Sequence, residues 1–463
     1  MKKTILVLMV IGFIVGTIFI TSAVGYLLGG WAEQWHLGWL TNLFILILGF
    51  VMIIATVLTL AERKWSAMMQ DRIGPNRARI NLPGLRNNSL GGLPHVISDS
   101  VKMLTKEDFR PKRADALLFN LGPILAFAPV LALFAVIPAG PTVTVFGRPF
   151  SFQIADPNFG LLWIFAIASL AVYGTTLAGW ASNNKFALLG GVRASSQMIS
   201  YEVALGLGLV GMMLTFATVR IPELVAGQTQ YLWGNSTPGW GDLGLPAWGI
   251  ILQPVGFLCF FAAAFAETKR APFDVPEGES EIIGYFVEYS GMKFGLFMIS
   301  EFAEVVVLSA IIVTVFLGGW HLPIYDHTLV AGLAELQRTT PTWGGIVGGA
   351  LYATIFWVKV IVLCYLQLAI RWTFPRFRYD QIETLGWKIL LPLGLLNVFV
   401  TGALVLIDPS LHFLAILGLV VIGFLLALTL RPKETAAAHG HDAAHGADDH
   451  GTHLSGATAS SHH

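Results

Sequence analysis

The sequence predicts an all-α protein, a polytopic bundle of about ten transmembrane helices. The chain of 463 residues is 55% hydrophobic and has a mean hydropathy of +0.69. Apolar runs of roughly 20 residues, long enough to cross a bilayer, recur along it. Because the hydrocarbon core offers the backbone no hydrogen-bond partners, such runs must form helices that satisfy their own amides and carbonyls.

The expected spans cover about residues 5–29, 37–61, 117–138, 161–181, 200–219, 247–266, 296–318, 345–370, 389–407 and 411–430. The first run follows Met1-Lys2-Lys3 and could be a signal peptide, but its length favours an uncleaved helix. Many secondary transporters contain two related halves, and we find no internal repeat of that kind in this sequence.

The basic residues predict the orientation of the bundle. Of the 28 Lys and Arg residues, 24 fall in segments that face the inside if the N-terminus is cytoplasmic. Outside loops hold only Arg148, Arg220 and Arg338, and Lys359 lies within a span. Cytoplasmic loops are enriched in Lys and Arg, so both termini are predicted to be cytoplasmic.

The first two inside loops contain turn signals and one short periodic segment. In the loop over residues 62–116, apolar residues at helical spacing predict an amphipathic interfacial helix over Leu93–Leu104, with a basic, lipid-contacting loop as the alternative. In the loop over residues 182–199, Asn183 and Asn184 are expected to end one helix. Gly190-Gly191 is expected to interrupt the chain before the next span.

The third inside loop is acidic. Its residues Pro272 to Met292 read PFDVPEGESEIIGYFVEYSGM and include five carboxylates, Asp274, Glu277, Glu279, Glu281 and Glu288. A helix beginning at Pro276, with Asp274 as a capping acceptor, would bring Glu277, Glu281 and Glu288 near one face.

Such an acidic row can have either of two roles. Like charges at this spacing raise each other's pKa, so a partly dehydrated row could hold and release protons near neutral pH. A solvated acidic loop balanced by Lys269, Arg270 and Lys293 explains the same residues equally well. The sequence alone leaves both interpretations open.

Charged residues also fall at or within predicted spans, namely Glu202, Glu267, Glu301, Glu304 and Lys359. Ionisable groups in a membrane are costly and usually line functional paths, so these five predict a polar path through the bundle. Whether Lys359 meets Glu202 or Glu301 is open. Cys259 and Cys364 form no CxxC motif, and the sequence has no Walker loop or Rossmann glycine pattern. We therefore expect no redox ligands, no metal site and no catalytic redox residue in this chain.

Six motifs then occur in one order: RIGPNR at Arg72–Arg77, SNNK at Ser182–Lys185, RASSQMISYE at Arg193–Glu202, RAPFDVPEGESE at Arg270–Glu281, EYSGMKF at Glu288–Phe294 and FPRFRYDQ at Phe374–Gln381. Together they closely resemble the quinone-channel membrane subunit of proton-pumping NADH–quinone oxidoreductase, respiratory complex I. Alternatives are the related subunits of membrane-bound hydrogenases and F420H2 dehydrogenase, a secondary transporter, and a structural anchor for peripheral enzymes.

The resemblance implies a domain map and a location in the bacterial inner membrane. It covers residues 37–407, an eight-helix core. Residues 1–36 and 408–430 would add one helix at each end. Residues 431–463 form a tail with seven of the 12 His residues. Its composition favours a disordered cytoplasmic segment over a Zn²⁺ or Ni²⁺ site.

The resemblance also implies roles for individual residues. The quinone cavity and docking loops would include Glu62, Arg63, Arg72, Gly74, Pro75, Arg77, Arg193, Arg270 and Phe273. Proton coupling would involve Glu202, Asp274, Glu277, Glu279, Glu281, Glu288, Glu301 and Lys359. Quinone would be the substrate, and FMN and iron–sulfur clusters would reside in partner subunits. The partners would be hydrophilic iron–sulfur and quinone-site subunits, small membrane subunits, antiporter-like subunits and lipid, with no nucleic acid.

Overall fold

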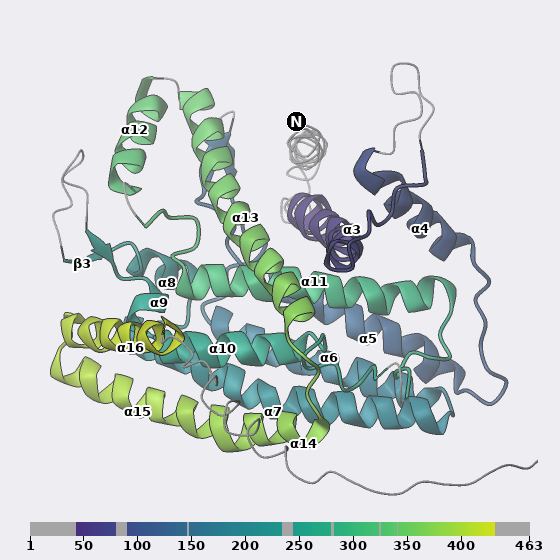
Figure 1. Cartoon of the computed structure of the whole chain (residues 1–463). Coiled ribbons are helices and arrows are strands. Elements are labelled where there is room, and N and C mark those ends of the chain that lie inside the picture. Colours follow the sequence, from purple (N-terminus) through teal and green to yellow (C-terminus); the bar gives the residue numbers. More distant parts are fainter. Residues whose placement is uncertain are drawn as a thin grey trace, which may run out of the picture. The chain divides into compact units, whose positions relative to one another are not determined.

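The computed structural model describes residues 43–79, 90–145, 148–233, 244–278, 282–323, 326–339 and 341–430, and these are mainly helical (Figure 1). The chain divides into two compact units, residues 1–421 and 422–463. The described part of the second unit consists of the last turns of one helix. The predicted first span and the His-rich tail lie outside the described residues.

Seven helical segments of the described chain are long and apolar enough to cross a membrane. They are α5 (Ala116–Phe134), α6 (Gly160–Ala181), α7 (Lys185–Phe216), α11 (Gly291–Phe316), Val347–Thr373 within α13 (Pro341–Thr373), Tyr379–Ile407 and α16 (His412–Leu430). Each coincides with a predicted span, so a helical membrane bundle is confirmed.

Two further predicted spans are helical but broken or short. The span near 37–61 is a π-helix, η1 (Phe44–Val51), that continues into α3 (Met52–Met69). The span near 247–266 is divided into α9 (Gly249–Leu252) and α10 (Pro254–Glu267). The predicted total of ten spans remains a prediction.

Shorter elements connect these helices. They are η2 (Leu90–Gly92), α4 (Leu93–Thr105), α8 (Ile221–Gly227), α12 (Asp326–Thr339), α14 (Tyr379–Thr384), η3 (Leu385–Leu390) and α15 (Leu391–Ile407). The helix α4 confirms the predicted amphipathic segment, because its apolar side chains Ile97, Val101 and Leu104 share one exposed face.

Two short antiparallel hairpins were not predicted. Strand β1 (Val143–Val145) pairs with β2 (Arg148–Phe150), and β3 (Tyr231–Trp233) pairs with β4 (Leu245–Pro246). Each strand has only two or three residues, too few for a recognisable alternation of apolar and polar side chains. The all-α prediction therefore holds only for the main architecture.

The boundary between α6 and α7 shows one correct and one wrong prediction. The Asn184 side chain accepts a hydrogen bond from the backbone N–H of Phe186 at 3.0 Å and so caps α7, as the two Asn residues suggested. Gly190-Gly191 does not interrupt the chain, because α7 is continuous from Lys185. A Cβ on Gly190 would lie 2.8 Å from the backbone N of Tyr285, so close packing explains this glycine.

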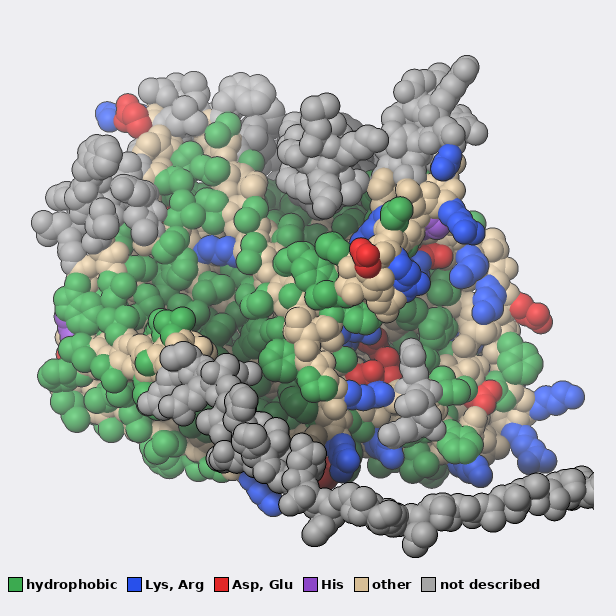
Figure 2. Space-filling view, viewed as in Figure 1, with side chains coloured by type: hydrophobic (Ala, Val, Ile, Leu, Met, Phe, Trp, Pro, Cys, Tyr) green, Lys and Arg blue, Asp and Glu red, His purple; other side chains and the backbone are tan. Residues whose placement is uncertain are grey.

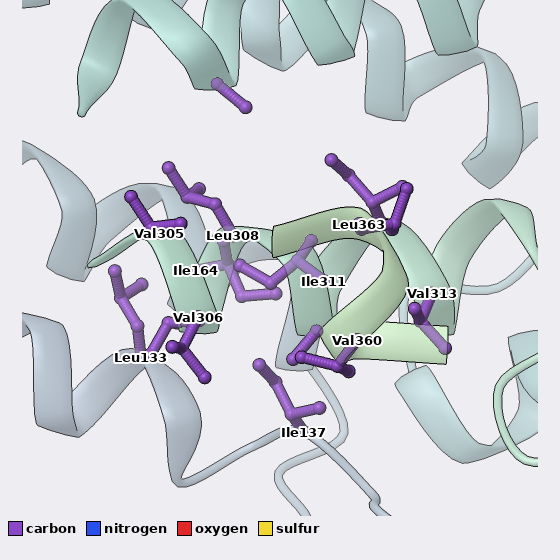
Figure 3. Close-up of a cluster of buried hydrophobic side chains, with 14 of the residues drawn as sticks. Leu133, Ile137, Ile164, Val305, Val306, Leu308, Ile311, Val313, Val360 and Leu363 are labelled. Atoms are coloured by element: carbon purple, nitrogen blue, oxygen red, sulfur yellow. The ribbon is translucent and has the colours of Figure 1, made fainter. Parts of the chain in front are cut away.

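The core is organised around α11. It packs against α3, α5 and α13, while α5 packs on α6, α6 on α7, and α7 on α10 and α15. Residues 300–316 are all buried, on every side of the helix. Figure 3 shows Val305, Leu308 and Ile311 of α11 among apolar side chains from neighbouring helices, including Ile164 of α6 and Val360 of α13. Two carboxylates, Glu301 and Glu304, belong to this buried stretch.

Candidate functional site

A cluster of charged side chains lies where α3, α11, α13 and the loop after α10 meet. Figure 2 shows that the visible acidic and basic side chains gather mainly toward α4, whereas α15 and α16 present hydrophobic side chains. At the centre, the Glu62 carboxylate of α3 accepts from Arg270 at 2.5 Å and from Arg371 of α13 at 2.6 Å. One carboxylate thus joins three parts of the chain that are far apart in sequence.

Arg270 connects Glu62 to α11. Its guanidinium lies 3.8 Å from the Glu301 carboxylate and 3.8 Å from the centroid of the Phe302 ring. Only 9% of Arg270 is exposed. A buried cation needs such partners because desolvation is costly, and a planar guanidinium can serve two carboxylates and stack on an aromatic face together.

Lys269 and Glu304 form a second buried pair. The lysine Nζ lies 3.6 Å from the Glu304 carboxylate, and 4% and 6% of the two side chains are exposed. Burial lowers the pKa of Lys269, but the negative charges of Glu304, Glu301 and Glu267 outweigh that effect and raise it above its ordinary value. Lys269 therefore stays positively charged inside the cluster.

Glu277 is the acidic-loop residue most closely tied to α11. Burial, followed by the charges of Glu301 and Asp274, raises the pKa of Glu277 well above its ordinary range. A carboxyl–carboxylate hydrogen bond to Glu301 favours the same protonated form of Glu277. The Tyr285 hydroxyl donates to Glu301 at 3.3 Å. Glu277 and Glu301 can thus hold one proton between them.

The expected helix from Pro276 is wrong for the described part of the loop. Residues 268–278 and 282–290 form turns and irregular backbone, while Glu279 and Glu281 lie outside the described residues. Long-range contacts fix the other carboxylates instead. Glu288 accepts from the Asn184 side chain at 2.7 Å, and Asp274 pairs with Arg376 at 3.2 Å rather than capping a helix.

Glu202 and Glu267 lie deeper among the helices. Glu202 is in the middle of α7, not at the start of a span, and it repels Glu267 of α10 electrostatically. Glu267 and Glu304 are the polar lining of an otherwise apolar cavity of about 20 Å³. A second cavity of about 20 Å³ is lined by Glu62, Arg270 and Arg371 among others. Each is large enough for one ordered water.

The predicted docking-loop residues lie at more exposed positions. Arg63 pairs with Asp99 of α4 at 2.5 Å, and Arg72 bonds to Gln70. Arg77 is exposed, whereas Gly74, Pro75 and Arg193 are partly buried. Phe273 is different, because it is buried against the rings of Tyr201 and Phe377, each 5.5 Å away between centroids. The structure therefore groups Glu62 and Arg270 with the carboxylates, and leaves the Arg63–Arg77 segment at the surface.

Lys359 also lies apart from the carboxylate cluster. Its ammonium donates to the backbone carbonyls of Leu317, Gly319 and His321 just beyond the C-terminal end of α11. The open question of whether it meets Glu202 or Glu301 is answered by these contacts, since Glu301 lies near the opposite end of α11.

Sequence analysis missed several residues of the cluster. Arg371 and Arg376 pair with Glu62 and Asp274, and Gln197 donates from its amide to the carbonyls of Ala266 and Phe273 at 2.8 Å. The sequence marks Arg371 and Arg376 only as positive charges of an inside loop. Among the described residues, no group of three or more His, Cys, Asp or Glu side chains is arranged to hold a metal ion, and Cys259 and Cys364 are buried and free.

Comparisons with known proteins agree over most of the chain. The family model described as NADH dehydrogenase matches residues 41–402. A Cytophaga hutchinsonii protein named as H subunit 1 of NADH-quinone oxidoreductase is 42% identical over 357 residues, 77% of this chain and 93% of that protein. A Geobacter sulfurreducens protein named as H subunit 2 of the same oxidoreductase is 41% identical over 358 residues, 77% of this chain and 93% of that protein. A Flavobacterium psychrophilum protein, named as its H subunit without a number, is 39% identical over 364 residues, 78% of this chain and 96% of that protein.

Proposed function

Because this chain belongs to the NADH dehydrogenase family, as an H subunit of NADH-quinone oxidoreductase, we propose that it forms the membrane cavity through which quinone reaches its reduction site. We also propose that it couples quinone reduction to proton translocation. Quinone is the substrate, and the electrons arrive from FMN and iron–sulfur clusters in partner subunits. This chain contributes binding surface, charge and proton-holding groups.

The connected charges around Glu62, Arg270, Glu301 and Glu277 support the coupling role. They form a continuous buried set that extends from the loop between α10 and α11 into the middle of α11. In a low-dielectric interior, adding or removing one charge changes the protonation of its neighbours strongly. Reduction of a quinone consumes protons, so it would shift this set, and Glu277 with Glu301 would take up or release the compensating proton.

The proposal places partners on both polar and apolar surfaces. The exposed loops that carry Arg63, Arg72 and Arg77 would dock the hydrophilic quinone-site and iron–sulfur subunits on the cytoplasmic side of a bacterial inner membrane. Small and antiporter-like membrane subunits would receive the charge change from α11 and its neighbours, including Glu202 and Glu288. Glu279 and Glu281 extend the same acidic loop in sequence, and we assign them the same role. The relatives' names favour this function over the hydrogenase, F420H2 dehydrogenase and transporter alternatives.

The test is a Glu277→Gln variant of the assembled complex in proteoliposomes. Gln keeps the size and the hydrogen-bonding ability of a protonated carboxyl but cannot lose a proton. We expect quinone reduction by NADH to continue at a reduced rate, while the number of protons moved per electron falls. Glu107→Gln, in the exposed loop after α4, is the control and should leave both quantities unchanged.

The ratio of protons to electrons decides the outcome, because general damage to the complex lowers both rates together. A Glu277→Gln complex that moves the full number of protons per electron would refute the role assigned to this carboxyl. The quinone cavity requires a separate test with a photoreactive quinone, which should label segments near Arg72, Glu202 and Glu279.

A further inference from the structure

The C-terminal end of α11 presents three backbone carbonyls to one side chain. Nζ of Lys359, from α13, lies 2.7 Å from the carbonyl oxygen of Leu317, 2.9 Å from that of Gly319 and 2.5 Å from that of His321. The Trp248 ring faces the same nitrogen, 4.4 Å from centroid to Nζ. Since α11 ends at Phe316, these carbonyls continue the negative end of the helix dipole.

The geometry requires a protonated amine. An ammonium group has three N–H donors and no acceptor, so it can serve three carbonyls at once. A neutral amine has two N–H donors and a lone pair, which would point at one of the oxygens. Converging carbonyl dipoles and an aromatic face both attract cations, and together they create a site suited to a positive charge.

The surrounding groups hold the same turn in place. Asp326, the first residue of α12, is buried, and its carboxylate lies 2.8 Å from Nδ1 of His321 and accepts from the backbone N–H of Leu322 at 3.0 Å. Its negative charge also attracts Lys359. Tyr352 of α13 faces His321, with ring centroids 6.0 Å apart. The turn over residues 317–322 is therefore held from α12 and from α13.

We propose that the end of α11 is a cation-binding site for an ammonium ion or a small primary ammonium group, and that the chain fills this site with its own Lys359. The tethered ammonium orders the turn over residues 317–322. This site lies away from the carboxylate cluster and does not depend on the function proposed above. Removing the lysine ammonium should leave a site that takes up free ammonium from solution.

The test compares Lys359→Met with the unaltered chain, each in the assembled complex. Backbone hydrogen exchange of residues 317–323 is followed by mass spectrometry in ammonium, methylammonium or sodium chloride at equal ionic strength. We expect exchange in Lys359→Met to be roughly tenfold faster or more, as hydrogen bonds to a charged group are lost. Ammonium and methylammonium should slow it again, whereas sodium should not, and the unaltered chain should not respond.

Lys293→Met is the matched control, because Lys293 also pairs at an end of α11, with Asp108 at 2.8 Å. It should leave exchange at residues 317–323 unchanged in all three salts. Lys359→Gln, which keeps two N–H donors, serves the same comparison if Lys359→Met does not assemble. Recovery that is equal in sodium and ammonium, or absent from ammonium, would overturn the proposal. Neither result depends on quinone reduction or proton transfer.

Discussion

Single carboxylates in this protein are controlled by partners that are remote in sequence. Glu62 is 208 residues from Arg270, and Glu288 is 104 residues from Asn184. The sequence could flag these residues because charges are rare in an apolar chain, but local spacing could not supply their partners. The predicted one-face row of Glu277, Glu281 and Glu288 failed in the described loop for that reason. Ion pairs to α3 and α13 outweigh the weak helix preference of a short acidic segment.

Glu277 should make the protein less stable as the pH rises. Burial and the charges of Glu301 and Asp274 place its pKa in the folded chain well above the ordinary value of 4.5. Between these two pKa values the folded state keeps a proton that the unfolded state has lost, so the free energy of unfolding falls with increasing pH. Thermal unfolding of the complex, followed for this chain from about pH 5 to pH 8, should show the decline.

Glu277→Gln removes the titrating group, so its decline should be shallower over the same pH range. Glu107→Gln, in an exposed loop, should reproduce the slope of the unaltered chain. Identical slopes for all three proteins would show that Glu277 does not hold a proton in the folded state.

At the scale of helices, hydropathy predicted positions well and packing poorly. Long apolar runs coincide with helices because the membrane leaves them no other structure. Helix ends with a side-chain cap, such as Asn184, were also predictable. The role of glycine was not, since Gly190 looks the same in sequence whether it breaks a helix or lets another backbone approach. Likewise, nothing in the local sequence shows that α11 is buried on every side while α16 is largely exposed.

The close approach of α6 to α5 should tolerate no added methyl group at Gly174. A Cβ there would lie 2.4 Å from the backbone N of Ala126 in α5, and backbone cannot move aside as a flexible side chain can. We expect Gly174→Ala to lower the free energy of unfolding by about 1–3 kcal/mol, as overpacking does. Thermal or denaturant unfolding of the purified complex measures the change.

Gly206→Ala is the matched control within the bundle. Its added Cβ would meet only the Phe165 ring at 3.7 Å, an ordinary contact, and Ala favours helix more than Gly does. Gly206→Ala should therefore be neutral or slightly stabilising. Equal losses in the two variants would contradict the packing explanation for Gly174.

For the whole molecule, the asymmetric distribution of charge was the most predictive feature. The excess of Lys and Arg in alternate loops gave an orientation, and the described structure gathers its buried ion pairs near the ends of α3, α10 and α13. What the sequence could not supply is the three-dimensional path between charges, because that path depends on which helices are neighbours. Lys359 shows this limit: its charge was predicted to matter, yet its partners are backbone carbonyls that no residue pattern marks.

The predicted orientation can be tested with single cysteines and a membrane-impermeant maleimide. Lys102→Cys in α4 should be labelled only in inverted vesicles, and Ala226→Cys in α8 only in right-side-out vesicles, because both positions are exposed and fall in loops of opposite predicted side. The native Cys259 and Cys364 are buried and serve as an internal background. Labelling of both variants from one side would refute the topology.

The carboxylate of Glu62 has a consequence for how the chain is made. Its two arginine partners, Arg270 and Arg371, leave the ribosome long after α3 has entered the membrane. During synthesis, α3 therefore waits with an unmatched acid at its polar end, and the acquisition of each arginine secures another part of the chain. Correct insertion thus depends on order in time: a nascent chain that stops before residue 371 lacks the last of these pairings, and quality-control proteases could distinguish it from a finished protein.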